Sequence, residues 1–314
     1  MNIYFTFDPR PDLKEPLIKQ FPEVNFIFHS RLDESELENV DVLVTYGEDL
    51  NEERIKIAKN LKWIFVASAG IEKMPAQAIA NQNILVSNVR GIHKTPMAES
   101  VLAHILSLNR ALTFIYENKR NKVWDKKARL SELNGSTALI IGPGAIGSEI
   151  GRLLQAFGVY TIGCNRSGED APFMNETYRI DDLKSQLPKA NIVISMLPST
   201  SETKYLLKYE HFQLMKEDTI FMNFGRGDLV KTEVLIQALE QKLIFHAVLD
   251  VFEEEPLPLT NKLWELDNIT ISPHFSSHSS RYVERSLEIF KPSLEKWLKG
   301  ETDVENKMNI LRGY

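Results

Sequence analysis

The chain has very little cysteine, no long apolar run and no excess of positive charge. Cys164 is the only cysteine among 314 residues, which excludes an internal disulfide and a thiolate-rich metal cluster. With 37 Lys and Arg against 43 Asp and Glu, the net charge is −6, so a basic face for nucleic acid is not expected. No apolar run reaches the ~18 residues of a membrane span, and the first residues lack the pattern of a signal peptide. We therefore expect a cytoplasmic protein without nucleic-acid or membrane partners.

The remaining composition is typical of a globular protein with a large core. Apolar residues make up 43% of the chain and charged residues 25%. Because a common domain has ~150 residues, this length predicts two domains. Short apolar runs alternate with segments of helical periodicity, which predicts an α/β fold with parallel sheets covered on both faces. The predicted strands are 3–7, 24–28, 41–45, 63–67, 84–87, 137–141, 159–163, 191–196, 219–223, 245–249 and 269–272.

A long helix is predicted between the two series of strands. Thr95 suits its N-cap and Pro96 its first position. An apolar stripe follows at helical spacing. Its members are Met97, Val101, Ile105, Leu108, Leu112 and Ile115. A second helical pattern at 283–297 contains Pro292, which we expect to interrupt it. The predicted domains are therefore 1–97 plus 284–314, and an inserted domain at 98–283.

A glycine-rich turn marks the start of the inserted domain's first strand–helix unit. Gly142, Gly144 and Gly147 fit the pattern G-x-G-x-x-G between an apolar strand and an apolar helix. In this context the pattern predicts a dinucleotide site, with the pyrophosphate on the free N–H groups of the helix start at Ala145 and Ile146. A plain strand–helix turn is the alternative.

The end of the following strand indicates which dinucleotide binds. An NAD-selective site has an acidic residue about 20 positions after the glycines, but this strand ends in Asn165, Arg166 and Ser167. A carboxylate ~5 Å from a phosphate charge would cost on the order of 3 kcal/mol at an effective dielectric of ~20, and an arginine reverses that preference. We therefore expect NADPH to be preferred, with NADH as the alternative cofactor. A solvated surface turn is the competing interpretation.

Three polar segments follow later strands of the inserted domain, at the sheet edge where α/β proteins bind ligands. They are Asn223–Gly227, Asp250–Pro256 and Ser272–His274. With the glycine turn and Val66–Ile71, these segments resemble the D-isomer-specific 2-hydroxyacid dehydrogenases over nearly the whole chain. The resemblance implies a Rossmann nucleotide-binding domain inserted into a flavodoxin-like α/β substrate domain. The family is commonly dimeric, so a homodimer is expected, with the stripe of the long helix as one contributor.

The resemblance also implies roles for particular residues. Arg226 would hold the substrate carboxylate and polarise its carbonyl, because its guanidinium is a planar fork of donors. His274 would give the proton, since histidine titrates near neutrality, and Glu255 would favour the imidazolium form and fix the ring. The backbone N–H groups of Ala69 and Gly70 would form a second clamp on the carboxylate. The remaining cofactor contacts would come from Leu197, Pro198, Asn223 and Asp250, with Asp250 on the nicotinamide carboxamide.

Alternatives remain for several of these residues. Glu255 lies in an acidic run that is typical of a solvated face, and Tyr46 could line the substrate pocket or simply pack in the core. His274 and His278 have the spacing of helical zinc ligands, but no third ligand is evident, so no metal is expected. The chain also departs from the family pattern after the histidine, where Phe275–His278 replace a glycine-containing stretch.

The combined pattern favours an NAD(P)H-dependent reductase of small 2-keto acids related to glyoxylate and hydroxypyruvate. The closing Arg312-Gly313-Tyr314 is a weaker indication of the same substrates. The competing hypothesis from another class is a dehydrogenase-like protein that senses NAD(P) and acts as a corepressor without significant turnover.

Overall fold

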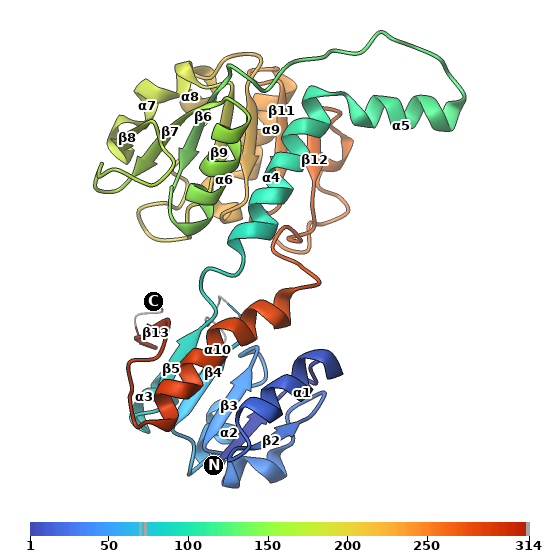
Figure 1. Cartoon of the computed structure of the whole chain (residues 1–314). Helices are drawn as coiled ribbons and strands as arrows, with labels where there is room; N and C mark the ends of the chain where they lie inside the picture. The colour runs from blue at the N-terminus through green and yellow to red at the C-terminus, as the bar shows by residue number, and fades with distance from the viewer. Residues whose placement is uncertain (69–70, 72–73, 312–314) are drawn as a thin grey trace. The chain divides into compact units, whose positions relative to one another are not determined.

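The computed structural model describes residues 1–68, 71 and 74–311. The chain forms two compact units, Met1–Ile92 with Ser279–Tyr314, and His93–His278 (Figure 1). The two divisions lie five residues before the boundaries that the sequence predicts. None of the helices in the described part of the chain is long and apolar enough to cross a membrane.

The first unit is built on a six-stranded sheet in the order β13-β5-β4-β3-β1-β2. Its strands are β1 (Asn2–Phe5), β2 (Asn25–Phe28), β3 (Val42–Thr45), β4 (Trp63–Val66), β5 (Leu85–Asn88) and β13 (Lys307–Met308). Its helices are α1 (Pro11–Gln20), α2 (Glu52–Ile57), α3 (Ala76–Asn81) and α10 (Tyr282–Leu298). Helices α1 and α10 pack on one face and α2 and α3 on the other, so the apolar strands are buried on both sides.

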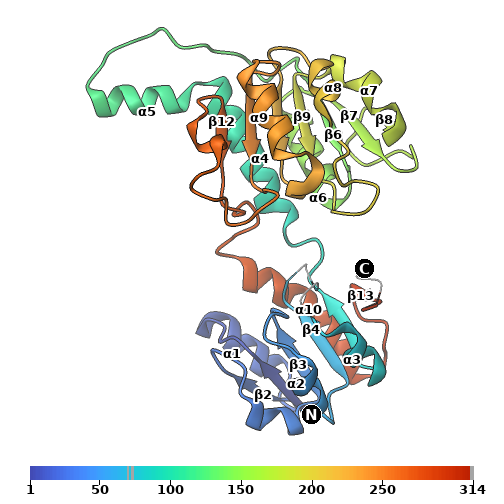
Figure 2. The same ribbon diagram turned by 180° about the vertical axis from the view of Figure 1, so that it is seen from behind.

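The second unit has a seven-stranded sheet in the order β12-β11-β10-β9-β6-β7-β8, with every pair parallel. Its strands are β6 (Thr137–Ile141), β7 (Tyr160–Asn165), β8 (Glu176–Arg179), β9 (Ile192–Ser195), β10 (Ile220–Asn223), β11 (His246–Leu249) and β12 (Ile269–Ile271). Its helices are α4 (Lys94–Asn109), α5 (Leu112–Asn121), α6 (Ala145–Ala156), α7 (Leu183–Gln186), α8 (Tyr209–Gln213) and α9 (Thr232–Glu240). Helices α4 and α6 cover one face, and α7, α8 and α9 cover the other (Figure 2).

The strand order of the second unit is that of a doubly wound dinucleotide fold, which reverses direction between β6 and β9. Ligands bind such sheets at the carboxyl ends of the strands beside this reversal. The glycine turn follows β6 directly, so the fold places it at that point.

Two sequence predictions about the long helix are wrong. Helix α4 already begins at Lys94 after a helical His93, so Thr95 lies inside the first turn and caps nothing. The helix also ends at Asn109, because Ala111 adopts a left-handed conformation with φ of 50°. Val101 and Ile105 are buried against the second unit's core, whereas Ile115 is 52% exposed. The predicted stripe is thus divided, and its first half is not available to a partner.

Other departures concern short or polar elements. Strand β8 is an edge strand of sequence Glu-Thr-Tyr-Arg, without the apolar run that marks buried strands. Strand β13 has two residues and runs antiparallel to β5, so the first sheet is mixed rather than parallel. Helix α10 continues through Pro292 as one element, and the expected interruption is not present.

Candidate active site

The glycine turn has the backbone geometry that phosphate binding requires. Gly142 has a φ of 89°, and its N–H donates to the Cys164 carbonyl at 2.9 Å. A Cβ on Gly147 would lie 2.7 Å from the Gly142 carbonyl oxygen, so only glycine allows helix α6 to start this close to β6. A Cβ on Gly144 would meet no atom within 4 Å, which leaves the turn open beside the helix start. The N–H groups of Ala145 and Ile146 have no acceptor within the helix and can bind an anion.

The strand-end turn after β7 is closed by the side chain of Asn165. Its Oδ1 accepts from the Gly168 N–H at 2.6 Å, and its Nδ2 donates to the Glu169 carbonyl at 2.8 Å. Arg166 and Ser167 are exposed on this turn. Cys164 within β7 is buried, and burial raises the pKa of its thiol to about 12, so it is a packed side chain and not a nucleophile.

The segment after β10 is fixed against the segment after β9. The Asn223 side chain is buried; it accepts from the Gly225 N–H at 3.2 Å and donates to the Arg226 carbonyl at 2.9 Å. A Cβ on Gly225 would lie 2.4 Å from the Leu197 carbonyl oxygen. Leu197 in turn lies against the glycine turn, 3.1 Å from where a Cβ on Gly142 would be. Asn223 therefore fixes the backbone conformation of the segment that carries Arg226, beside Leu197.

The Arg226 loop also packs tightly on the loop after β11. A Cβ on Gly227 would lie 1.9 Å from the carbonyl carbon of Phe252, which no side chain can satisfy. The exposed Arg226 guanidinium donates from Nη1 to the Gly225 carbonyl at 2.9 Å. Glycines on both sides of Arg226 are thus required by close backbone contacts, which explains the local sequence.

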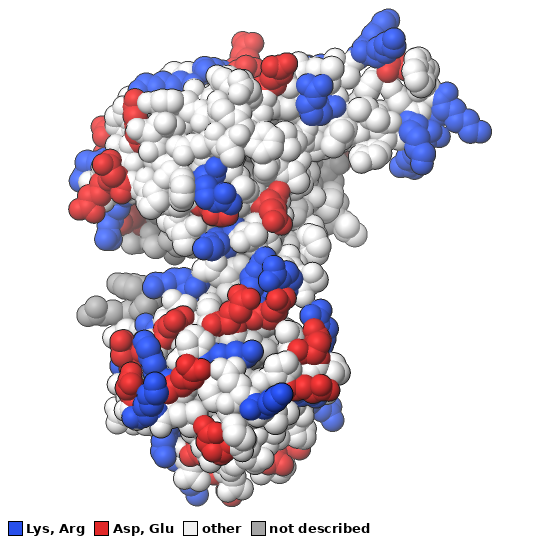
Figure 3. Space-filling model, viewed as in Figure 1, with Lys and Arg blue, Asp and Glu red and all other residues white. Residues whose placement is uncertain are grey.

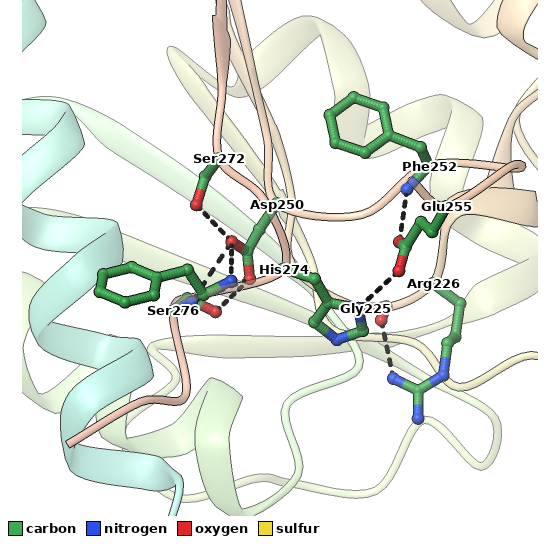
Figure 4. Close-up of polar contacts among 9 residues, drawn as sticks. Gly225, Arg226, Asp250, Phe252, Glu255, Ser272, His274 and Ser276 are labelled. Atoms are coloured by element: carbon green, nitrogen blue, oxygen red, sulfur yellow. Dashed lines mark hydrogen bonds and ion pairs between the residues drawn. The ribbon is translucent and has the colours of Figure 1, made fainter. Parts of the chain in front are cut away.

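His274 and Glu255 are hydrogen-bonded, the contact that the family resemblance implies. The His274 Nδ1 and the Glu255 Oε2 are 2.8 Å apart, and the other carboxylate oxygen accepts from the Phe252 N–H at 2.9 Å. With Nδ1 engaged, Nε2 is the ring atom that remains for a substrate. The side chains are 48% and 36% exposed, so the pair is accessible. Figure 4 shows His274, Glu255 and Arg226 on neighbouring loops, which follow β12, β11 and β10.

Asp250 organises the segment that carries His274. The carboxylate is 1% exposed; its Oδ1 accepts from the Ser272 hydroxyl at 2.5 Å and from the Phe275 N–H at 2.9 Å. Its Oδ2 accepts from the hydroxyl of Ser276 and from the Ser276 N–H at 3.2 Å (Figure 4). Both sides of His274, whose φ is 52°, are therefore tied to one buried carboxylate. Sequence reasoning gave no role to the Ser272 hydroxyl, which lies in the segment that carries the resemblance, or to Ser276, which lies where the chain departs from the family pattern.

The remaining predictions concern Ala69, Gly70, the terminal residues 312–314 and Tyr46. Ala69 and Gly70, and the terminal 312–314, lie outside the described residues. Tyr46 packs on Phe7 with ring centroids 4.7 Å apart, is 38% exposed, and burial raises the pKa of its hydroxyl. Within residues 1–68, 71 and 74–311, no three His, Cys, Asp or Glu side chains are grouped as metal ligands.

Comparison with known proteins identifies the family of this chain. Residues 102–276 match the family model described as D-isomer specific 2-hydroxyacid dehydrogenase, NAD binding domain. The chain belongs to this family. The family resemblance inferred from the motifs is therefore confirmed, and the chain is a member of a family of NAD(P)-dependent oxidoreductases.

Relatives of the family differ in the substrate that their names give. The glyoxylate reductase of Thermofilum pendens is 30% identical over 266 residues, which cover 83% of this chain and 78% of that protein. The D-3-phosphoglycerate dehydrogenase of Methanocaldococcus jannaschii is 30% identical over 278 residues, 87% of this chain but only 52% of that longer protein.

The fold is also that of a solved family member. The crystal structure of a D-isomer specific 2-hydroxyacid dehydrogenase family protein from Aeromonas salmonicida has a TM-score of 0.84 and 28% identity, and covers 98% of this chain and 99% of that chain. The predicted fold class, with a Rossmann-type sheet and a second α/β sheet, is thereby confirmed.

Proposed function

We propose that this chain reduces a small 2-keto acid of the glyoxylate or hydroxypyruvate type, with NADPH preferred over NADH. The observation that carries the proposal is the 2.8 Å contact between His274 and Glu255, with Arg226 on the neighbouring loop. The name of the Thermofilum pendens relative, glyoxylate reductase, supports the substrate class. The proposal assigns the cofactor to the unit that contains the glycine turn.

The chain's own residues would each supply one part of the reaction. The Arg226 guanidinium binds the substrate carboxylate and polarises the keto oxygen, as charge-assisted hydrogen bonds do. The His274 imidazolium donates its Nε2 proton to the developing alkoxide, while Glu255 holds Nδ1 and fixes the ring. The family resemblance would assign the second carboxylate clamp to the backbone amides of Ala69 and Gly70, which lie outside the described residues. When bound, the reduced nicotinamide supplies the hydride.

Residues at the carboxyl ends of β6, β7, β9, β10 and β11 fit a dinucleotide. The open turn at Gly144 and the free N–H groups of α6 suit the pyrophosphate. Leu197, Pro198, Asn223 and Asp250 would line the nicotinamide half, with Asp250 on the carboxamide. The same carboxylate holds the His274 segment. Arg166 and Ser167 would bind the 2′-phosphate of NADPH beside the turn that Asn165 closes.

A homodimer through helix α5 and the segment after it belongs to the same proposal. Ile115, Tyr116 and Val123 are more than half exposed, and Trp124 is 93% exposed. Figure 3 shows Lys and Arg side chains gathered at the end of this helix. Trp124→Ser should weaken self-association about tenfold or more, as loss of an interface aromatic does, in sedimentation at micromolar concentration. Leu259→Ser, at an equally exposed position, is the matched control. A monomeric wild type removes this part of the proposal.

The test of the function is NADPH oxidation against a panel of 2-keto acids, repeated with NADH. We expect turnover with glyoxylate or hydroxypyruvate and a higher kcat/KM for NADPH than for NADH. A preference for NADH contradicts the Arg166 argument. Negligible turnover with every keto acid, despite tight NADPH binding, instead favours the corepressor-like hypothesis.

A further inference from the structure

A strand that the sequence did not predict brings a second arginine to the strand-end turn after β7. Strand β8 pairs in parallel with β7, and their last residues, Arg179 and Asn165, are register partners. Asn165 is the residue whose side chain closes the turn that carries Arg166 and Ser167. Arg179 is therefore adjacent to the proposed 2′-phosphate residues Arg166 and Ser167, although it is 12 to 13 positions away in sequence.

The Arg179 side chain contacts the turn after β7 at two points. Its guanidinium donates from Nη1 to the Ser167 carbonyl at 3.4 Å. Gly168, with a φ of 77°, packs so closely that an added Cβ would lie 2.7 Å from the Arg179 Cγ. The stem of Arg179 is thus in contact with the turn, and its charge lies next to the backbone of Ser167.

The Arg179 charge is available to a ligand at little cost. Its partner in the chain is Asp181, at 3.5 Å, and the two side chains are 57% and 74% exposed. An exposed ion pair of this kind contributes about 0–1 kcal/mol. A guanidinium has five N–H donors, so the bond to Ser167 leaves others for an anion. A phosphate monoester carries nearly two negative charges near pH 7 and competes well for such a group.

We propose that Arg179 is a specificity-determining residue that, with Arg166 and Ser167, binds the 2′-phosphate of NADPH. The inference rests on the proposed NADPH preference and adds a residue from a different strand. Two guanidiniums can contact a dianionic phosphate from two sides, whereas NADH presents only a hydroxyl at that position. Arg179 then discriminates between the two cofactors without contacting the reacting atoms.

A purely structural role for Arg179, in which it only supports the turn, makes different predictions for substituted side chains. Arg179→Gln keeps a donor for the Ser167 carbonyl but removes the charge. Arg179→Lys keeps the charge with poorer geometry, and Arg179→Ala removes both. If the charge binds phosphate, Arg179→Gln should lose as much affinity for the 2′-phosphate as Arg179→Ala, and Arg179→Lys should retain part of it. If Arg179 only supports the turn, Arg179→Gln should bind the 2′-phosphate as tightly as the wild type.

The experiment is calorimetric titration of the full chain with adenosine 2′,5′-bisphosphate and, as the probe without a 2′-phosphate, AMP. We expect Arg179→Ala and Arg179→Gln each to raise the Kd for the bisphosphate roughly tenfold, the effect of one charge-assisted contact, with the AMP Kd unchanged. Arg166→Ala should act similarly. Arg152→Gln, at an exposed arginine of α6 paired with Glu149, is the control and should change neither Kd.

The outcomes distinguish the role of Arg179 from the NADPH preference on which it rests. A wild type that binds the bisphosphate no better than AMP overturns both the NADPH preference and the role of Arg179. A wild type that prefers the bisphosphate, together with an Arg179→Gln variant of unchanged affinity, overturns the role of Arg179 alone. Equal losses of affinity for the bisphosphate and for AMP in the Arg179→Ala, Arg179→Gln and Arg166→Ala variants also overturn the role of Arg179, because they indicate a damaged turn.

Discussion

The two sheets of this protein are alike in construction and different at their carboxyl ends. Each is an apolar α/β sheet covered by helices on both faces. In the second unit, the strand ends carry the glycine turn, Arg226, the Glu255 loop and His274. In the first unit, the neighbouring strands β1 and β3 are followed by Phe7 and Tyr46, whose rings pack together. The comparison indicates that the architecture determines where a site can lie, and that the loop residues determine whether it has chemistry.

The cores differ as well. Phe290 of α10 is fully buried against a cluster of rings in the first unit, with centroid distances of 5.6 Å to Phe5, 5.6 Å to Trp63 and 5.0 Å to Phe65. The second unit's core is mainly aliphatic. Substitutions in the described part of the first unit should therefore act mainly on stability, and substitutions at the second unit's strand ends mainly on catalysis.

The largest effect is expected for Arg226→Gln. Loss of a bidentate charged contact to the substrate carboxylate and of carbonyl polarisation should lower kcat/KM for the keto acid roughly 10³-fold. The melting temperature should change little, because the side chain is exposed and bonds only to the Gly225 carbonyl within the described residues. Steady-state kinetics measure kcat/KM, and thermal unfolding measures the melting temperature. A variant that loses stability but keeps kcat/KM would place Arg226 outside the site.

Phe290→Ala should show the opposite behaviour. Removing a fully buried ring costs about 3–5 kcal/mol of unfolding free energy. The denaturant midpoint of unfolding should therefore be lower than that of the wild type, while the NADPH Kd of the folded protein stays near the wild-type value. Ile18→Ala, at a 44% exposed position of the same unit, is the control and should be nearly neutral. A large rise in the NADPH Kd for Phe290→Ala would argue against the separation of roles.

A smaller effect is expected on how the unfolding free energy depends on pH, through His246 in the second unit. Burial lowers the pKa of His246, at the start of β11, to about 4, and its Nε2 lies 2.9 Å from the Thr270 hydroxyl. Because the unfolded chain takes up this proton near pH 6.5, the stability that the neutral ring contributes is complete above that pH. It falls as the pH drops toward 4, by up to about 3 kcal/mol.

The measurement is the unfolding free energy of wild type and His246→Gln at pH 7 and pH 4.5. The wild type should lose more stability between these values than the variant does. Parallel losses in the two proteins would show that His246 is not the group responsible.

Apolar pattern was sufficient to predict the buried strands, and β6 was predicted with its observed ends. The apolar pattern did not predict the elements whose backbone conformation is not determined by burial. Edge strand β8 is polar, and the turn at Ala111 lies where the chain leaves the core. At the site, the polar segments after the strands indicated where ligands bind, and the family resemblance selected Arg226, Glu255 and His274, but neither indicated the bond from the Phe252 N–H to Glu255. That bond, like those of Asp250 and Arg179, depends on how separate loops meet in three dimensions.

The most direct test of the account is the rate of NADPH oxidation by His274→Gln at saturating keto acid, with the NADPH Kd measured on the same sample. We predict a rate lower by roughly 10²–10⁴-fold, the usual contribution of a general acid, with the Kd within about twofold of wild type. His278→Gln, whose ring contacts the Phe275 carbonyl, is the control for loss of a nearby imidazole. A His274→Gln rate equal to that of the wild type would contradict the assignment of His274 as proton donor.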